Sequence, residues 1–331
     1  MDITMVSSVL KYNGKRHPKI DLHAHFLPEA YLAALELQGE KDPDGFPTPA
    51  WSAEDHVRFM DKLGIDCSFL SISSPHINFG DRQQSALLAG KVNDFAAGLA
   101  RAYPGRFGVT ASLPVPYVEE SVKEIRYCRK TLSVDGFALP TNSRGTYLGS
   151  DELTPVFSEL NGIGAVVVLH PNKPGAVPEG VNEELPAPAM EFLFDTTRTI
   201  TNMMLKGIFK RFPDINFVVP HAGAFLTLLA DRLMPLLEMR GNMKKGTVFG
   251  TMERLYYDLA GFCLPRQLDN LLQIVSHEHL FYGSDTPYTP EMGCILLADA
   301  LDKTTLLSDR QREDVYRNNA VKLFPRVAGA Q

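Results

Sequence analysis

The sequence predicts a parallel (β/α)8 barrel of the TIM type, and three observations lead to this prediction. Short apolar, β-branched segments recur along the chain, and each is followed by a longer helical pattern. Eight such segments can be recognised, and alternating strands and helices imply a parallel sheet with right-handed crossovers. The length of 331 residues also suits one barrel of this kind with insertions.

The expected strands lie at residues 20–25, 66–72, 107–113, 136–140, 165–171, 216–223, 255–261 and 280–285. Helices are expected near residues 52–64, 83–102, 117–131, 151–161, 191–211, 224–240, 264–275, 290–302 and 308–323. Ser52 is a suitable N-cap for the first of these helices, and Gly64 is a suitable stop at its end. An open, doubly wound sheet is the alternative architecture. The first strand, KIDLHAHFLP (19–28), argues against it because no glycine-rich phosphate loop follows.

Two long connections interrupt the alternation of strands and helices. Residues 26–51 follow the first strand and residues 171–190 follow the fifth, and both segments are rich in proline and glycine. Loops of this length are usually functional, and both leave the carboxyl end of a strand, where the active sites of barrels lie. We therefore expect two lids over an active site. No linker or repeat divides the chain, so one domain over residues 1–331 is expected.

Composition narrows the classes of partner. The formal net charge is −6, and no basic patch of the kind that binds nucleic acid is present. No apolar run of about 18 residues exists, so we expect no membrane span. The first eighteen residues lack a basic start followed by an apolar stretch, which argues against a signal peptide. The four cysteines are widely spaced, as reduced thiols would be, and a cytoplasmic location is expected.

Polar side chains close four of the expected strands. His23 and His25 end the first strand and share a face because side chains alternate along a strand. His170 ends the fifth strand, His221 the sixth and Asp285 the eighth. A single histidine at such a place is more often a hydrogen-bonded structural residue, and an aspartate before Thr-Pro is often a turn residue. Five such groups at one mouth of an apolar barrel are costly unless they are paired or metal-bound, so we expect a metal site.

The residue types restrict the metal chemistry. Imidazole and carboxylate ligands suit zinc, manganese, iron or nickel, and the absence of a cysteine cluster excludes a thiolate site. Three histidines and one carboxylate would leave one or two coordination positions for water or substrate. That pattern is typical of a catalytic site and not of a closed structural one.

Motifs spread along the chain resemble those of the amidohydrolase superfamily. They are DLHAHFLP (21–28), MDKLGID (60–66), YPGRFGVTASLPV (103–115), VVLHP (167–171), FKRFPDINFVVPHAGAF (209–225) and FYGSDTPYTP (281–290). More narrowly, the chain resembles the metal-dependent decarboxylases around 2-amino-3-carboxymuconate-6-semialdehyde decarboxylase and the resorcylate and 6-methylsalicylate decarboxylases. HxH alone is weak evidence, but HxH, HP, HAG and GSD in this order at strand ends are strong evidence.

The resemblance implies a site with one divalent metal ion, zinc in the first place and manganese in the second. It makes His23, His25, His170 and Asp285 the metal ligands and His221 the acid/base residue beside the metal. Many hydrolases of the superfamily carry a carboxylated lysine at the end of the fourth strand. The corresponding segment here, GFALPTNS, has no lysine, which favours a mononuclear site.

The resemblance also bears on substrate and assembly. In the muconate-semialdehyde enzyme an arginine eleven residues after the sixth-strand histidine reaches the neighbouring subunit's substrate. The matching residue here is Arg232, and the resemblance therefore implies a homodimer. An ordinary surface salt bridge within the chain would explain Arg232 equally well. That enzyme has another arginine before the tryptophan of its first lid, whereas KDPDGFPTPAW (41–51) contains none. A small aromatic monocarboxylate is therefore expected. The expected substrate-binding residues are Phe46, Trp51, His76, Asn172, Arg232 and Tyr288.

These expectations combine into a reaction: non-oxidative decarboxylation of a 2-hydroxybenzoate-like acid. The metal would hold the carboxylate and the ortho hydroxyl, and Asp285 or His221 would protonate the ring carbon. The alternative is a metal-dependent hydrolase or hydratase acting on a lactone, an amide or an unsaturated acid. A metal-binding barrel without catalysis is a third interpretation, and the intact set of ligands argues against it.

Overall fold

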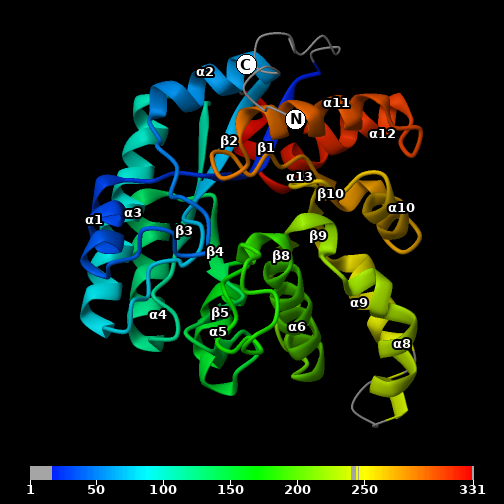
Figure 1. Cartoon of the computed structure of the whole chain (residues 1–331), viewed down its shortest axis with the longest axis horizontal. Helices are drawn as coiled ribbons and strands as arrows, with labels where there is room; N and C mark the ends of the chain where they lie inside the picture. The colour runs from blue at the N-terminus through cyan, green and yellow to red at the C-terminus, as the bar shows by residue number, and fades with distance from the viewer. Residues whose placement is uncertain (1–16, 240–243, 245, 330–331) are drawn as a thin grey trace.

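Eight parallel strands form one sheet that closes into a barrel (Figure 1). The computed structural model describes residues 17–239, 244 and 246–329. The strands follow one another around the sheet in chain order: β1 (Lys19–His25), β2 (Ile65–Ser71), β3 (Phe107–Ser112), β4 (Gly136–Pro140), β7 (Val166–His170), β8 (Asn216–Val219), β9 (Tyr256–Asp258) and β10 (Leu280–Phe281). A parallel bridge between Ala24 and Thr286 joins the two ends of the sheet, and the main-chain N–H of His25 donates to the Thr286 carbonyl at 2.8 Å. The predicted (β/α)8 barrel is confirmed.

Helices connect the strands on the outside of the barrel (Figure 1). They are α1 (Glu29–Leu37), α2 (Ala53–Leu63), α3 (Arg82–Ala102), α4 (Val118–Tyr127), α5 (Thr154–Gly162), α6 (Glu191–Leu205), α7 (Ile208–Arg211), α8 (Leu226–Met239), α9 (Thr247–Arg254), α10 (Arg266–Leu272), α11 (Glu291–Lys303), α12 (Asp309–Glu313) and α13 (Asn319–Leu323). The predicted caps of α2 are confirmed: Ser52 accepts from the N–H of Asp55, and Gly64 is left-handed at φ 70°. No helix in the described part of the chain is both long and apolar enough to cross a membrane.

Three helical predictions differ from the structure. The expected helix over 191–211 is broken at Gly207, whose φ of 66° ends α6 and starts α7. Helix α1 lies inside the segment expected to be a loop, because EAYLAALEL is rich in good helix formers. Helix α9 was not expected at all. The last residue of the helix expected over 224–240, and residues 1–16 of the segment searched for a signal peptide, lie outside the described residues.

The interior of the barrel is packed below the mouth. One cluster of buried side chains draws on five strands around the barrel, with Leu22, Phe69, Val168, Val218 and Phe281 among its members. Phe324 from the C-terminal segment joins this cluster and packs its ring 4.3 Å from that of Phe69. A solid interior of this kind makes the barrel a rigid support and leaves the carboxyl ends of the strands as the place for a site.

A two-stranded ribbon stands beside that mouth. It pairs β5 (Asn142–Ser143) with β6 (Thr146–Tyr147) directly after β4. The two segments predicted to be lids also meet there. The N–H of Ala187 donates to the main-chain oxygen of Asp44 at 2.8 Å, and a Cβ added to Gly45 would lie 3.3 Å from Cα of Pro186. Close contact between residues 26–51 and 171–190 thus gives one wall beside the barrel mouth.

Candidate metal centre and active site

Four side chains at the carboxyl ends of β1, β7 and β10 converge on one point. The ligand atoms of His23, His25, His170 and Asp285 all lie within 4.8 Å of one another. Among the described residues this is the one group of three or more histidine, cysteine or acidic side chains that could hold a metal ion. The structure therefore brings together, from positions between 23 and 285 of the chain, the four residues that the sequence singled out as ligands.

Each histidine of this group is held by a partner at Nδ1. The Nδ1 of His23 lies 2.9 Å from the Asp258 carboxylate, that of His25 lies 3.2 Å from the Ser71 carbonyl, and that of His170 lies 2.8 Å from the Pro171 carbonyl. A carbonyl or carboxylate can only accept, so each Nδ1 carries a proton, and each Nε2 is the atom whose lone pair a metal ion would take. The Nε2 atoms of His23 and His25 are 3.2 Å apart. Three oriented imidazole nitrogens and a carboxylate fit a divalent metal ion.

The carboxylate of Asp285 completes the group. Its Oδ1 lies 3.1 Å from Nε2 of His25 and 3.5 Å from Nε2 of His23, and Oδ2 accepts from the Thr289 hydroxyl at 3.2 Å. Burial would raise the pKa of Asp285, but the two imidazoles hold it well below its usual range. Asp285 has a positive φ of 60°, and its N–H donates to the His23 carbonyl at 2.7 Å. Strand β1 and the segment after β10 are thus locked together where the ligands meet.

Two buried aspartates that the sequence analysis did not select support this arrangement. Asp258 ends β9 and is fully buried; its Oδ2 faces His23 and its Oδ1 accepts from the N–H of His221 at 3.0 Å. Burial alone would lower the pKa of His23, but the Asp258 carboxylate raises it to about 9. Asp21 accepts from the N–H and the hydroxyl of Ser284, at 3.0 and 2.6 Å. Asp258 was not selected from the sequence because it lies in the middle of the strand predicted over 255–261, whereas the observed strand β9 ends at Asp258.

His221 stands beside the four ligands without belonging to them. Its ring lies 5.0 Å from the His23 ring and 6.3 Å from the His170 ring. Its Nδ1 is buried and has no hydrogen-bond partner among the described residues, and burial lowers its pKa. Gln267 holds the main chain by donating to the His221 carbonyl at 2.5 Å. A neutral imidazole held in this way, on the wall of a cavity, can accept or donate a proton.

The cavity in front of the metal-ligand group has a volume of about 650 Å³. His170, His221 and Asp285 line its floor, and apolar side chains make most of its walls, including Phe46, Phe192, Phe262, Met292 and Leu296. Tyr288 lines it as well, with its ring 5.5 Å from that of His25. Neither lysine nor arginine is among the described residues that line it. The cavity therefore suits a largely apolar ligand whose anionic group meets the ligand cluster.

The other expected substrate-binding residues lie elsewhere. Trp51 does not line the cavity: its ring packs against Phe26 and Phe95, and its Nε1 donates to Nδ1 of His56 at 3.0 Å. Tertiary contacts, among them that with His56 on α2, determine where the Trp51 side chain points, and no local sequence pattern predicts these contacts. Arg232 lies exposed on α8, with no ion pair in the described part of the chain.

His76 and Asn172 are buried and do not line the cavity. Neither ring nitrogen of His76 has a hydrogen-bond partner among the residues described, and burial lowers its pKa to about 3. The amide of Asn172 donates to the carbonyls of Asn142 and Pro75, at 3.0 and 3.3 Å. Of the six side chains expected to bind substrate, the structure thus places Phe46 and Tyr288 on the cavity.

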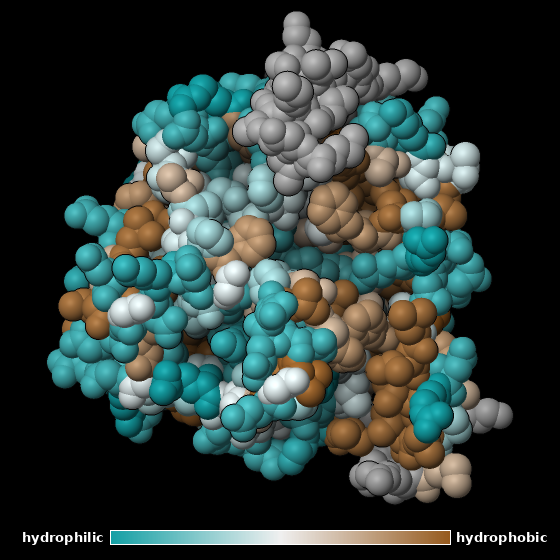
Figure 2. Space-filling view, viewed as in Figure 1, coloured by the Kyte–Doolittle hydropathy of each residue, from teal (hydrophilic) through white to brown (hydrophobic). Residues whose placement is uncertain are grey.

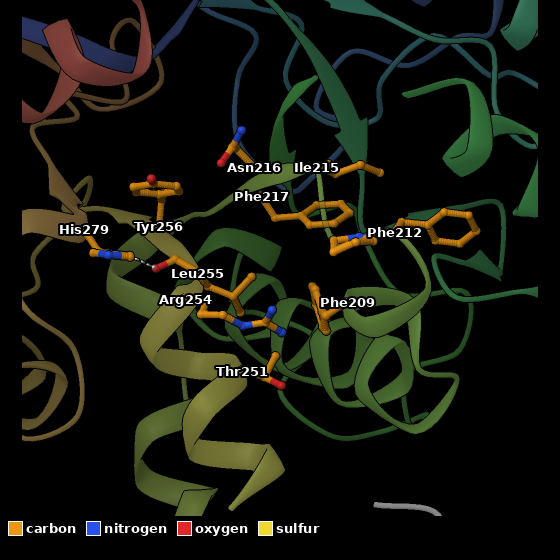
Figure 3. Close-up of a pocket in the computed structure, with 11 residues that line it drawn as sticks. Phe209, Phe212, Ile215, Asn216, Phe217, Thr251, Arg254, Leu255, Tyr256 and His279 are labelled. Atoms are coloured by element: carbon orange, nitrogen blue, oxygen red, sulfur yellow. Dashed lines mark hydrogen bonds between the residues drawn. The ribbon is translucent and has the colours of Figure 1, made fainter. Parts of the chain in front are cut away.

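A second hollow lies at the opposite end of the barrel. Figure 3 shows it at the starts of β8 and β9, with Phe209, Phe217 and Arg254 around it. Its volume is about 230 Å³. Tyr256 stacks on His279 with ring centroids 4.7 Å apart, and Nδ1 of His279 lies 3.0 Å from the Leu255 carbonyl. Because it lies away from the ligand cluster and at the amino ends of the strands, it is not the site of the chemistry.

Comparison with known proteins gives a consistent result. The model of the amidohydrolase family matches residues 20–326. The decarboxylase yanB of Aspergillus niger is 32% identical over 326 aligned residues, which cover 93% of this chain and 88% of that protein. The 6-methylsalicylic acid decarboxylase of Penicillium expansum is 30% identical, with 94% of this chain and 97% of that protein covered.

Solved structures agree on the fold. A crystal structure described as an amidohydrolase II is 41% identical, covers 93% of this chain and 99% of its own, and superposes with a TM-score of 0.90. The dihydroxybenzoic acid decarboxylase of Polaromonas sp. JS666, solved with manganese and the inhibitor 2-nitroresorcinol, is 20% identical, covers 93% and 97% of the two chains, and has a TM-score of 0.78.

Proposed function

The chain belongs to the amidohydrolase family, and from this premise we propose that it is a metal-dependent, non-oxidative decarboxylase of a small 2-hydroxybenzoate-like acid. The observation that carries the proposal is the convergence of His23, His25, His170 and Asp285 at the floor of an apolar cavity, with His221 beside them. The relatives support the reaction, since yanB is named as a decarboxylase and the Penicillium expansum protein as a decarboxylase of 6-methylsalicylic acid.

His23, His25, His170 and Asp285 would hold the ion. A divalent metal bound there would act as a Lewis acid and would position the substrate carboxylate together with its ortho hydroxyl. The donor set suits both zinc and manganese, and the manganese in the Polaromonas enzyme supports the second. Metal analysis of the purified protein, followed by reconstitution with each ion, decides between them.

The protein groups around the substrate supply the remaining steps. The apolar walls exclude water and position the ring, with Tyr288 and Phe46 as the aromatic contacts. Either Asp285, after it has taken up a proton from water or from the substrate, or His221 delivers a proton to the ring carbon that carries the carboxylate. The bond from that carbon to the carboxylate then breaks, and aromaticity returns as CO2 leaves. The lining contains no lysine or arginine among the described residues, which favours a monocarboxylate.

The test is a panel of 2-hydroxybenzoates incubated with the metal-reconstituted protein. We expect release of CO2 and of the matching phenol from at least one member, and loss of that activity after chelation. Silence across the panel combined with turnover of lactones or of unsaturated acids would overturn the decarboxylase and favour the hydrolase or hydratase alternative.

We further propose a homodimer that forms through α8. Figure 2 shows hydrophobic side chains gathered over this helix at the lower right of the view. Leu228, Leu236 and Met239 are 64%, 52% and 83% exposed, and the spacing from 228 through 232 to 236 puts Arg232 on the same helical face. A second copy covering this face would bury the leucines and carry Arg232 towards its partner. Gel filtration tests it: a wild-type protein that elutes as a strict monomer would remove both the dimer and the intersubunit role of Arg232.

All four cysteines are buried and unpaired. Free thiols fit a reducing compartment, and this supports the proposal of a cytoplasmic location, which cell fractionation would test.

A further inference from the structure

A buried carboxylate in the wall of the cavity has no role in the chemistry described so far. Asp44 lies in the segment after α1, is 7% exposed and lines the cavity. Its Oδ1 accepts from the Ser74 hydroxyl at 2.9 Å. No donor among the described residues reaches Oδ2, and Oδ2 is not one of the fully buried side-chain atoms without a partner, so it is accessible to a group in the cavity that Asp44 lines. An accessible acceptor of this kind can bind a donor that enters the cavity.

The structural contacts of Asp44 use its main-chain oxygen and one of its two carboxylate oxygens. Its contact with the second segment is made by its main-chain oxygen, which accepts from the N–H of Ala187 at 2.8 Å. Its contact with the residues after β2 is made by Oδ1 through Ser74. Neither contact needs the second carboxylate oxygen, and a serine or asparagine could serve both. The second carboxylate oxygen is therefore left to bind a group that enters the cavity, and the positive charge of Lys173 favours the anionic form of Asp44.

The position of Asp44 relates it to the metal-ligand group. Burial raises the pKa of Tyr288, and the negative charges of Asp44 and Asp285 add to the rise. Ser73 and Tyr288 line the same cavity as Asp44. Burial raises the pKa of Asp44 to about 6, with Ser74 and Lys173 opposing the rise. At neutral pH Asp44 is therefore mainly an anion, which accepts hydrogen bonds and repels other anions.

We propose that Asp44 is a specificity-determining residue that accepts a hydrogen bond from a second hydroxyl of the substrate, remote from the carboxylate and its ortho hydroxyl. The substrate class is then a dihydroxylated aromatic monocarboxylate, and a second carboxylate at that position is rejected by charge repulsion. This inference rests on the proposed function, because it places the first carboxylate at the ligand cluster. A site built to pair a substrate hydroxyl discriminates strongly against the analogue that lacks it.

The experiment compares salicylate with its 2,3-, 2,4-, 2,5- and 2,6-dihydroxy counterparts on the metal-loaded protein. We expect wild type to favour at least one dihydroxy isomer over salicylate by about tenfold or more in kcat/KM. In Asp44→Ala that preference falls by about tenfold, whereas kcat/KM for salicylate changes less than about threefold. Asp42→Asn is the matched control, because Asp42 lies two residues away, is exposed and does not line the cavity. It should keep the wild-type preference.

A parallel measurement separates this inference from the proposed function. Calorimetry gives the Kd of salicylate and of each dihydroxy isomer for both proteins, whether or not CO2 is released. If no acid is decarboxylated but the Kd ratio still depends on Asp44, the reaction is wrong and the Asp44 contact stands. If Asp44→Ala weakens salicylate and every isomer equally, or leaves the preference unchanged, Asp44 is structural and the inference is overturned.

Discussion

The imidazole of His23 and the carboxylate of Asp258 lie 2.9 Å apart, although 235 residues separate them in the chain. Both are buried at the barrel mouth, and the other oxygen of Asp258 holds the main chain of His221 at 3.0 Å. One carboxylate thus orients a proposed metal ligand and the proposed acid/base residue together. An outer carboxylate of this kind fixes the tautomer of a ligand histidine and increases its basicity.

The first prediction follows from that contact. Asp258→Asn replaces the acceptor facing Nδ1 of His23 with an amide, so the ring is no longer held in the metal-binding tautomer. We expect metal affinity to fall by about 10- to 100-fold, measured by competition with a chromophoric chelator. Asp269→Asn, which removes an exposed carboxylate on α10, should leave the affinity unchanged. Equal affinities of the Asp258 variant and wild type would contradict this role.

The second prediction concerns His221, whose Nδ1 has no partner among the described residues. Because His221 is not one of the four side chains grouped as ligands, His221→Gln should retain the wild-type metal content. We expect its kcat to fall by about 10²- to 10⁴-fold, the usual worth of a positioned proton-transfer group. His279→Gln, at the other end of the barrel (Figure 3), is the histidine control. Loss of the metal from the His221 variant would instead make this residue a ligand.

The third prediction concerns Asp285, which is placed both as a ligand and as a proton donor to the ring. We expect Asp285→Asn, loaded with metal at saturating concentration, to lose at least about 10²-fold in kcat. Thr289→Val removes only the hydroxyl that donates to Asp285 at 3.2 Å, and should cost about tenfold or less. An Asp285 variant that is fully metal-loaded and turns over at the wild-type rate would exclude this residue as the proton donor.

The barrel and the ligand cluster could be predicted from the sequence, because both depend on the regular alternation of strands and helices. Each strand is short and apolar, and His23, His170 and Asp285 close strands whose carboxyl ends must meet in a parallel barrel. Asp258 ends the observed strand β9, but the strand was predicted to run on to residue 261, so Asp258 did not stand at a predicted strand end. Asp44 could not be found, because its burial depends on how two irregular segments meet, and such segments carry no periodic pattern.

The position of Trp51 was predicted wrongly for the same reason, because it depends on tertiary contacts. Trp51 precedes α2 and follows a proline-rich segment, and this position favoured a role in the cavity. Its Nε1 instead donates to Nδ1 of His56, in the first turn of α2, at 3.0 Å. His56 is buried, and its Nε2 has no hydrogen-bond partner among the described residues. A buried imidazole that accepts at Nδ1 must be neutral with its proton on Nε2. Burial accordingly lowers the pKa of His56 to about 3.

This pKa gives the fourth prediction, a pH dependence of stability. In the unfolded chain the pKa of a histidine is about 6.5, so below that pH the unfolded state binds a proton that the folded state refuses until pH falls to about 3. The contribution of neutral His56 to the free energy of unfolding is therefore fully present above about pH 6.5. It decreases as the pH falls, and about 2 kcal/mol of it is lost at pH 5. His56→Gln, which can still accept from Trp51, should lose about 2 kcal/mol less than wild type between pH 7.5 and pH 5 in urea unfolding. Identical losses in the two proteins would show that His56 is protonated without cost in the folded state.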